Sequence, residues 1–206
     1  MFHGSPHCLA RVAPVRFVSH SVVVMADLSV RPALPDDAPA LGRIHAANFL
    51  DTLACGLGEL PAGLAEELDP ELFVEQWRAA ITAPPSAKHR VVTALAEARV
   101  VGFAAIAPTE QLYEDATGST GPEAEVVALE VGAGDRRLGH GSRLLAAATD
   151  ILRATGAGAV QVWCVPEDEA RVRFLVSAGF QPRGVRRRYD VAGASLTENA
   201  WYALLD

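Results

Sequence analysis

The side chains best suited to chemistry lie in residues 124–145, AEVVALEVGAGDRRLGHGSRLL. An apolar, β-branched run that carries Glu125 predicts a strand, and a short turn with paired arginines then leads into a helical pattern. The first N–H groups of a helix have no partner within it and lie at the positive end of its dipole, so such a turn can bind phosphate. Gly139 and Gly141 would let a pyrophosphate approach the backbone closely. The segment therefore predicts a strand, a phosphate-binding turn and a helix.

Two other nucleotide-binding motifs do not fit this turn. The dinucleotide fingerprint requires G-x-G-x-x-G. The position of the third glycine is Leu144 after Gly139-x-Gly141 and Arg137 after Gly132-x-Gly134. A P-loop requires Gly-Lys-Ser/Thr, which the sequence lacks. A purely structural connection is the remaining alternative. Paired arginines disfavour it, because they add positive charge where a phosphate would bind.

Glu125 is the candidate general base. A positioned carboxylate can accept a proton from a reacting group, directly or through water. A carboxylate half-buried in an apolar strand is a stronger base than one in water. A solvated carboxylate at the edge of the sheet is the alternative. Glu130 is a weaker candidate, since the two-residue period of a strand predicts that it faces the opposite side.

These motifs together resemble one family. The pattern Arg136-x-x-Gly139-x-Gly141 resembles the Q/R-x-x-G-x-G/A signature of the GCN5-related N-acetyltransferases (GNAT), which bind acetyl-CoA by its pyrophosphate at such a turn. The resemblance continues through VWCV at 162–165 and RFLVSAGF at 173–180, and it covers residues 28–206. It implies an acetyl-CoA-dependent N-acetyltransferase. It also implies an α/β (α+β) fold, with a mixed central sheet flanked by helices in the order β-α-α-β-β-β-α-β-α-β-β.

The resemblance implies roles for the matching positions. Several family members use a glutamate at the position of Glu125. Backbone amides of residues 137–142 would hold the pyrophosphate, main-chain groups of residues 129–131 would pair with pantetheine, and Phe174 would pack nearby. The implied cofactor-binding residues are Leu129, Glu130, Val131, Arg136, Arg137, Leu138, Gly139, His140, Gly141, Ser142 and Phe174.

Leu175 departs from the family pattern, in which a tyrosine often follows the phenylalanine and is proposed to protonate the CoA thiolate. Leucine cannot donate a proton, so either the thiolate leaves unaided or another group acts instead. Tyr189 is one substitute, although packing is the commoner role of such a tyrosine. The departure also leaves open a catalytically silent acyl-CoA-binding sensor or interaction module. Asp168, where relatives often have an asparagine, is interpreted as a helix N-cap.

The charge distribution suggests a cationic acceptor. The 206 residues are 50% hydrophobic and carry a net charge of −7, which suits one globular domain and disfavours binding to nucleic acid or membrane surfaces. Acidic residues gather in 51–77 and 100–135, while arginines concentrate after residue 135. Since the resemblance places the acceptor beside the two acidic segments, an acidic mouth would attract a cationic amine. Ordinary solvated surface is the alternative.

Cysteine and histidine predict no metal site. The three cysteines show neither metal-ligand spacing nor a disulfide pattern, and His45, His89 and His140 are too scattered. This cysteine usage favours a reducing cytoplasm. Family members often dimerise, so the resemblance also implies a homodimer.

Residues 1–24 lack the features of a signal peptide and contain no membrane-length apolar run. We interpret them as a poorly ordered or non-native extension before a GNAT domain at 25–206, so a chain starting at Met25 is expected to fold. The remaining pattern predicts strands at 28–31, 91–95, 100–106, 125–131, 159–165, 186–189 and 200–205, and helices at 36–47, 70–81, 139–155 and 167–178. Asp36 or Asp37 would cap the first helix, and Gly56 would interrupt the region that follows.

Overall fold

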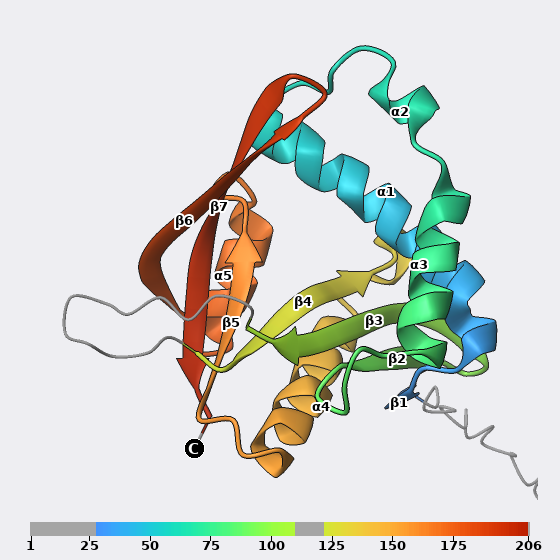
Figure 1. The fold of residues 1–206 in the computed structure, drawn as a ribbon, viewed down its shortest axis with the longest axis vertical. Coiled ribbons are helices and arrows are strands. Elements are labelled where there is room, and N and C mark those ends of the chain that lie inside the picture. The colour runs from blue at the N-terminus through green and yellow to red at the C-terminus, as the bar shows by residue number, and fades with distance from the viewer. Residues whose placement is uncertain (1–27, 110–121, 206) are drawn as a thin grey trace, which may run out of the picture.

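The chain forms a seven-stranded mixed sheet flanked by helices, in a computed structural model that describes residues 28–109 and 122–205 (Figure 1). The strands lie in the order β1 (Leu28–Pro32), β2 (Arg90–Ala96), β3 (Arg99–Pro108), β4 (Ala124–Val131), β5 (Ala159–Cys164), β7 (Ala194–Leu204) and β6 (Gln181–Val191). The helices are α1 (Ala38–Leu57), α2 (Leu64–Glu67), α3 (Pro70–Thr82), α4 (His140–Ala154) and α5 (Glu169–Ser177). The predicted fold class is confirmed, with the single turn of α2 as an addition. The predicted extension at 1–24 lies outside the described residues.

Apolar side chains cover both faces of the sheet. Leu144 of α4 and Leu175 of α5 pack in the core on one face. Leu41 of α1 packs with Phe103 of β3 on the other face, which α3 also covers. The two layers hold the strands rigidly from both sides, so side chains at the strand ends are well positioned.

The sheet opens between β4 and β5. These two strands are parallel, and they pair only where Ala124 meets Val160 and Glu125 meets Gln161. Beyond these pairs the strands diverge (Figure 1). The later residues of β4 therefore have β3 as a neighbour on one edge and no strand on the other.

A β-bulge in β4 changes which side chains share a face. Val126 pairs with Ile106 and Ala128 with Ala105, so Val127 has no partner in β3. One extra residue inverts the alternation of side chains beyond it. Glu125 and Glu130 consequently lie on the same face, which α1 and α3 cover. The prediction that Glu130 faces the opposite side is wrong, because the two-residue period does not hold through a bulge.

Helix α1 is longer than predicted, and its N-cap residue Asp37 lacks the predicted side-chain capping bond. It continues to Leu57, where Gly58 with φ +77° ends it. Gly56 lies inside the helix and does not interrupt it. Glycine is needed there because a Cβ would come within 2.8 Å of the Val165 side chain. The Asp37 carboxylate does not cap α1. It instead accepts a hydrogen bond from the Leu34 backbone N–H at 2.8 Å and pairs with a neighbouring arginine.

The ends of other elements match their local chemistry. Asp69 caps α3 by accepting a hydrogen bond from Glu71 N at 3.0 Å, and Pro70 is the first helical residue, as predicted. The strands of the last hairpin are 11 residues each, longer than predicted. Ala192 and Gly193 join them with φ of +49° and +81°, as in a two-residue hairpin turn. Only residues 186–189 of strand β6 were predicted, because β6 is an exposed, arginine-rich edge strand without alternating apolar residues.

Close packing of α1 on α3 predicts the effect of a small substitution. A Cβ at Gly42 would lie 2.6 Å from Val74 N and 2.8 Å from Val74 Cα. Backbone atoms cannot move aside unless the helices separate. Gly42→Ala is therefore expected to lower the free energy of unfolding by about 1–3 kcal/mol, despite the higher helix propensity of alanine. Denaturant unfolding measures this loss. Gly134→Ala is the control, since no atom lies within 4 Å of a Cβ there, and an equal loss in both variants would contradict the packing argument.

Candidate active site

The turn before α4 has the geometry of an anion site. Arg137 and Gly139 both adopt left-handed backbone conformations, with φ of +66° and +83°, and the helix begins at His140. Successive N–H groups in such a turn converge on a concavity, and the first turn of α4 adds the positive end of the helix dipole. The nearest protein atoms to a Cβ at Gly141 would be in the Phe174 ring, 3.8 Å away. Glycine at this position therefore keeps space open for a ligand and not for another part of the protein.

A cavity of about 500 Å³ opens beside this turn. Its walls come from the turn, from the open edge of β4 and from α1 and α5. Six of the predicted cofactor-binding residues line it: Leu129, Val131, Arg136, Arg137, Gly141 and Phe174. The fold therefore brings the two ends of the predicted cofactor site together.

The other predicted cofactor residues lie outside this cavity. Leu138 is 58% exposed. His140 is only 2% exposed, and burial lowers the pKa of its imidazole, so its backbone N–H is the group available at the turn. Gly139 is the N-cap of α4. Ser142 lines a separate cavity of about 330 Å³ between α4, α5 and the end of β7.

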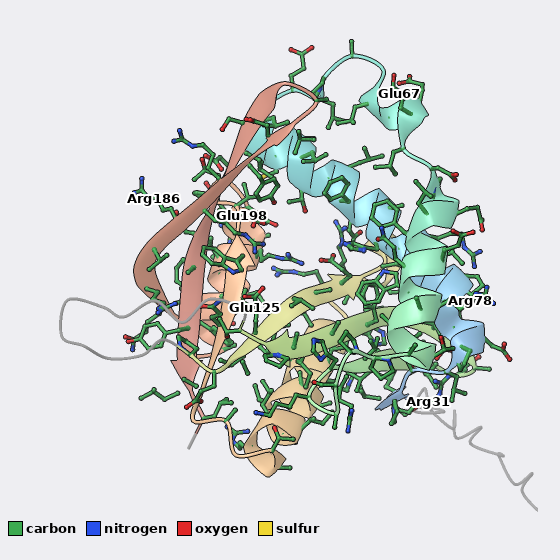
Figure 2. All side chains as sticks on the ribbon, in the orientation of Figure 1. Arg31, Glu67, Arg78, Glu125, Arg186 and Glu198 are labelled. Atoms are coloured by element: carbon green, nitrogen blue, oxygen red, sulfur yellow. The ribbon has the colours of Figure 1, made fainter. Side chains whose placement is uncertain are left out.

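A second, smaller cavity of about 180 Å³ lies on the α1 side of β4. Glu125 and Glu130 of β4 line it, together with residues of α1, α5 and the last hairpin. Figure 2 labels two of the lining carboxylates, Glu125 and Glu198. Aromatic walls come from Phe49, Trp163 and Phe174. The cavity therefore combines carboxylates with flat apolar surfaces.

Two of the three carboxylates in this cavity are neutralised by arginines. Glu130 pairs with Arg171 at 2.9 Å, and Glu198 pairs with Arg187 at 2.6 Å. Across residues 28–109 and 122–205, Glu125 has no ion pair.

Glu125 is instead held by neutral donors. Its Oε2 accepts hydrogen bonds from Gln161 Nε2 at 2.7 Å and from Trp163 Nε1 at 3.1 Å. These bonds fix the orientation of the carboxylate without cancelling its charge. The small cavity thus contains one uncompensated negative charge.

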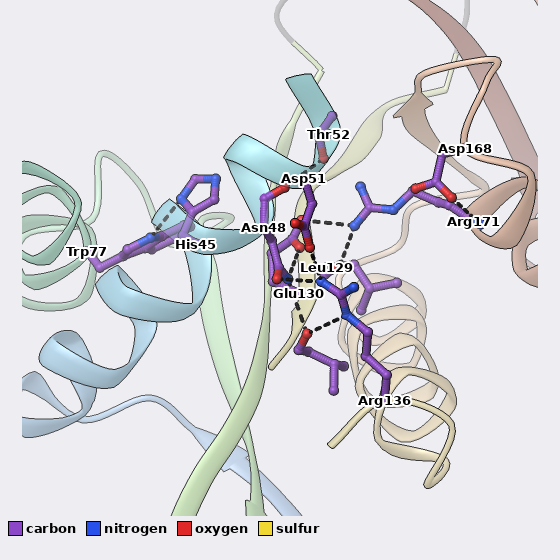
Figure 3. A network of polar contacts seen from close by, with 11 residues as sticks. His45, Asn48, Asp51, Thr52, Trp77, Leu129, Glu130, Arg136, Asp168 and Arg171 are labelled. Carbon is purple, nitrogen blue, oxygen red and sulfur yellow. Dashed lines mark hydrogen bonds and ion pairs between the residues drawn. The ribbon is translucent and has the colours of Figure 1, made fainter. Parts of the chain in front are cut away.

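Glu130 is the centre of a polar network between three elements (Figure 3). Asn48 Nδ2 of α1 donates to Glu130 Oε2 at 2.7 Å. Arg171 Nη2 of α5 donates to Glu130 Oε1 at 2.9 Å and to the Leu129 carbonyl at 2.7 Å. A buried carboxylate whose two oxygens are bonded in this way holds its neighbours in place. Glu130 is therefore a positioning residue, and its side chain is not free to act as a base.

Arg136 joins the turn before α4 to α1. Its Nη2 donates to Asn48 Oδ1 at 2.6 Å and to Asp51 Oδ2 at 3.0 Å, and its Nε donates to the Val131 carbonyl at 3.3 Å. The carbonyls of Val131 and Leu129 thus accept hydrogen bonds from side chains on the open edge of β4. Sequence reasoning missed Asn48 and Arg171. The signal for Asn48 was a polar residue on the inner face of α1, and for Arg171 an arginine one turn before Leu175.

A model of the acetyltransferase (GNAT) family matches residues 56–180. The chain belongs to this family. The match includes the turn before α4, both strands of the open edge and α5. A search of curated protein sequences finds no match.

Solved structures share the GNAT fold of the chain. The structure of yncA from Salmonella typhimurium with acetyl-CoA is 18% identical, with a TM-score of 0.62 over 87% of this chain and 94% of that one. A ribosomal-protein-alanine N-acetyltransferase from Brucella melitensis is 23% identical, with a TM-score of 0.63 over 86% and 99%. A phosphinothricin acetyltransferase from Sinorhizobium meliloti in complex with AcCoA is 16% identical, with a TM-score of 0.61 over 86% and 88%.

The GNAT site has no tyrosine acid on α5. Leu175 is 1% exposed and packs in the core. Tyr189 lines the small cavity, and burial together with Glu198 raises its pKa to about 12. His45 lines the same cavity, and its Nδ1 accepts a hydrogen bond from Trp77 Nε1 at 3.1 Å. Burial lowers the pKa of His45, so the neutral ring carries its proton on Nε2.

Burial raises the pKa of both cysteine thiols in the described part of the chain. Burial raises the pKa of the Cys164 thiol to about 12, which makes it an inert core residue. Cys55 lines the larger cavity, and burial raises its pKa as well. Among the described residues, no cluster of histidine, cysteine, aspartate and glutamate could hold a metal ion. None of the described helices is both long and apolar enough to span a membrane.

Proposed function

We propose that this GNAT chain is an N-acetyltransferase that transfers an acetyl group from acetyl-CoA to a primary amine, with Glu125 as the general base. The observation that carries the proposal is the relation between the two cavities. The cavity beside the phosphate turn and the cavity that contains Glu125 have five lining residues in common: Asn48, Thr52, Leu129, Arg171 and Phe174. A donor in one cavity and an acceptor in the other would therefore meet across this shared wall.

The larger cavity suits acetyl-CoA. The turn at residues 137–142 offers backbone N–H groups, a helix N-terminus and the charge of Arg137 to a pyrophosphate. Space at Gly141 permits a close approach, and the open edge of β4 can accompany an extended pantetheine arm. Two structures that share the fold, yncA and the phosphinothricin acetyltransferase, are described with acetyl-CoA bound. Acetyl-CoA supplies a thioester carbonyl that an amine can attack.

In the proposed reaction, Glu125 takes the proton of that amine. As the C–N bond forms and the C–S bond breaks, the amine must lose one proton, and Glu125 Oε accepts it directly or through one water. Gln161 and Trp163 orient the carboxylate through their hydrogen bonds to Oε2. Because no ion pair cancels its charge, Glu125 also attracts a protonated amine before transfer.

The cavity favours a small or terminal cationic amine. Among its charged residues, the Glu130–Arg171 and Glu198–Arg187 pairs cancel, which leaves the single negative charge of Glu125. A volume of about 180 Å³ limits how much of the acceptor enters. Phe49 and Trp163 offer apolar surface to the part of the acceptor next to the amine. The acceptor is therefore a small-molecule amine or the end of a longer chain.

The remaining expectations concern partners and location. The net charge of −7 supports the absence of nucleic-acid and membrane-surface partners. A homodimer and a cytoplasmic location are further proposals. Analytical ultracentrifugation tests the first, with a monomer at micromolar concentration contradicting it. Cell fractionation tests the second.

A thiol-release screen tests the function. Acetyl-CoA is incubated with the protein and a panel of amines that includes phosphinothricin, a peptide with an N-terminal alanine, and small diamines. We expect CoA release with at least one cationic primary amine, and none with its N-acetylated form. Acetyl-CoA binding without turnover across the panel would favour a catalytically silent acyl-CoA-binding module. Leucine at position 175, in place of the tyrosine that many family members have, is the observation that supports this second candidate.

A further inference from the structure

The wall shared by the two cavities has one charged residue. Of the five residues that line both cavities, Asn48, Thr52, Leu129 and Phe174 are uncharged, and Arg171 is a cation. If an acyl group passes from a donor in the larger cavity to an amine in the smaller one, the bond that breaks lies at this wall. Arg171 is therefore the cation at the place where the charge of the leaving group develops.

Arg171 is firmly positioned and still has donors to offer. Its backbone N–H donates to the Asp168 cap at 2.9 Å, which anchors it in the first turn of α5. Only Nη2 of its guanidinium is bonded, to Glu130 and to the Leu129 carbonyl (Figure 3). Its Nε and Nη1 make no hydrogen bond to any residue in 28–109 or 122–205, and the side chain is 28% exposed. A guanidinium has five N–H donors in a rigid fork, so several remain for a ligand.

We propose that Arg171 is a further catalytic residue, which stabilises the negative charge on the CoA sulfur as the C–S bond breaks. This inference rests on the proposed function and deepens it. The amine nitrogen forms a bond to the carbonyl carbon, the electron pair of the C–S bond passes to sulfur, and Glu125 takes the amine proton. The thiolate then takes a proton from solvent, and Glu125 returns its proton to solvent.

The guanidinium acts through its charge and hydrogen bonds and not by giving up a proton. Burial lowers the pKa of Arg171, but the charge and hydrogen bond of Glu130 outweigh this and raise it overall, so Arg171 stays protonated. A fixed cation beside a developing thiolate lowers the free energy of the charged state without any proton transfer. This explains how the site can function with Leu175 in place of a proton-donating tyrosine.

The competing role for Arg171 is purely structural: a brace, meaning a side chain that holds β4 in place through its hydrogen bonds to Glu130 and to the Leu129 carbonyl. The ionisation of CoA in its complex with the protein distinguishes the two roles without any acceptor amine. A nearby cation favours the thiolate, whereas a brace does not act on it. Ultraviolet absorbance of the thiolate, followed against pH with saturating protein, measures this ionisation.

We expect CoA bound to the wild-type protein to show roughly tenfold or more thiolate than free CoA at the same pH below its pKa. Arg171→Gln combined with Glu130→Gln should remove most of this excess, since it replaces the ion pair by neutral groups that still bond to each other. Arg171→Lys, which keeps one charge but loses the fork, should retain part of it. Arg187→Gln with Glu198→Gln is the matched control, because it removes an equivalent ion pair that lines only the smaller cavity. Its thiolate fraction should equal that of the wild type.

Calorimetry and thermal unfolding first establish that each variant is folded and binds CoA. Bound CoA that ionises like free CoA in the wild-type protein would overturn the role of Arg171, whatever the variants do. An unchanged excess in the folded double variant would also overturn it and leave only the brace. These outcomes leave the proposed function intact. A wild-type protein that does not bind CoA would instead contradict the proposed function, and the inference with it.

Discussion

Glu125→Gln lowers turnover with a responsive amine by about 10²–10⁴-fold near neutral pH, as expected for loss of a positioned general base. The amide keeps the shape of the side chain and can still accept a hydrogen bond from Gln161 or Trp163, so the cavity stays intact. Acetyl-CoA affinity should be unchanged, because Glu125 does not line the larger cavity. Steady-state release of CoA thiol measures the turnover, and calorimetry measures the affinity.

The deficit of Glu125→Gln should also depend on pH. A base matters most where the amine is protonated, so the deficit should shrink as pH rises and the amine becomes neutral without help. Glu123→Gln is the matched control, since this nearby carboxylate bonds to Gly158 N at 2.9 Å and lines neither cavity. It should retain wild-type turnover. Full activity of Glu125→Gln at neutral pH would rule out the base assignment.

Gly141→Asp is expected to abolish acetyl-CoA binding, for which we expect a wild-type affinity in the micromolar range or tighter. The substitution places a side chain and a negative charge in the cavity where the pyrophosphate would lie, beside Arg137. It should not disturb folding, because the nearest protein atoms to the new Cβ are in the Phe174 ring at 3.8 Å. Calorimetry with acetyl-CoA measures the loss.

A series of substitutions at position 141 separates the effect of side-chain size on acetyl-CoA affinity from the effect of side-chain charge. Gly141→Ala should weaken binding least, Gly141→Asn more, and Gly141→Asp most, since only aspartate adds repulsion of the phosphates. Thermal unfolding should be similar for all three variants. Unchanged acetyl-CoA affinity in folded Gly141→Asp would show that the turn at 137–142 is not the phosphate site.

The glycine-rich turn before α4 and the strand that carries Glu125 could be predicted because their signals are local. A glycine such as Gly139 is favoured where φ is positive, and a following helical pattern sets the N-terminus and its dipole. The helix caps at Asp69 and Asp168 could likewise be predicted from the sequence, since each side chain accepts a hydrogen bond from a backbone N–H two or three residues away. Features of this kind depend on a few neighbouring residues and need no knowledge of the fold.

The face of Glu130 could not be predicted, because it depends on strand pairing. Only the register of β4 against β3 shows that Val127 is an extra residue, and this bulge brings Glu130 to the same side as Glu125. Likewise, the close approach of Leu196 and Val165 to position 56 explains a glycine inside α1, and helix propensity alone does not show it.

The sequence by itself determined the family resemblance, the order of the main elements, the turn that suits a phosphate and the carboxylate that suits a base. Only the tertiary structure decided that Glu125 is the carboxylate of the smaller cavity without an ion pair among the described residues, because Arg171 of α5 and Arg187 of β6 pair with Glu130 and Glu198. It also decided that Arg171 lies on the wall between the two cavities. Ion pairs and shared cavity walls arise between segments far apart in the chain, and their energies depend on distances that no local pattern specifies.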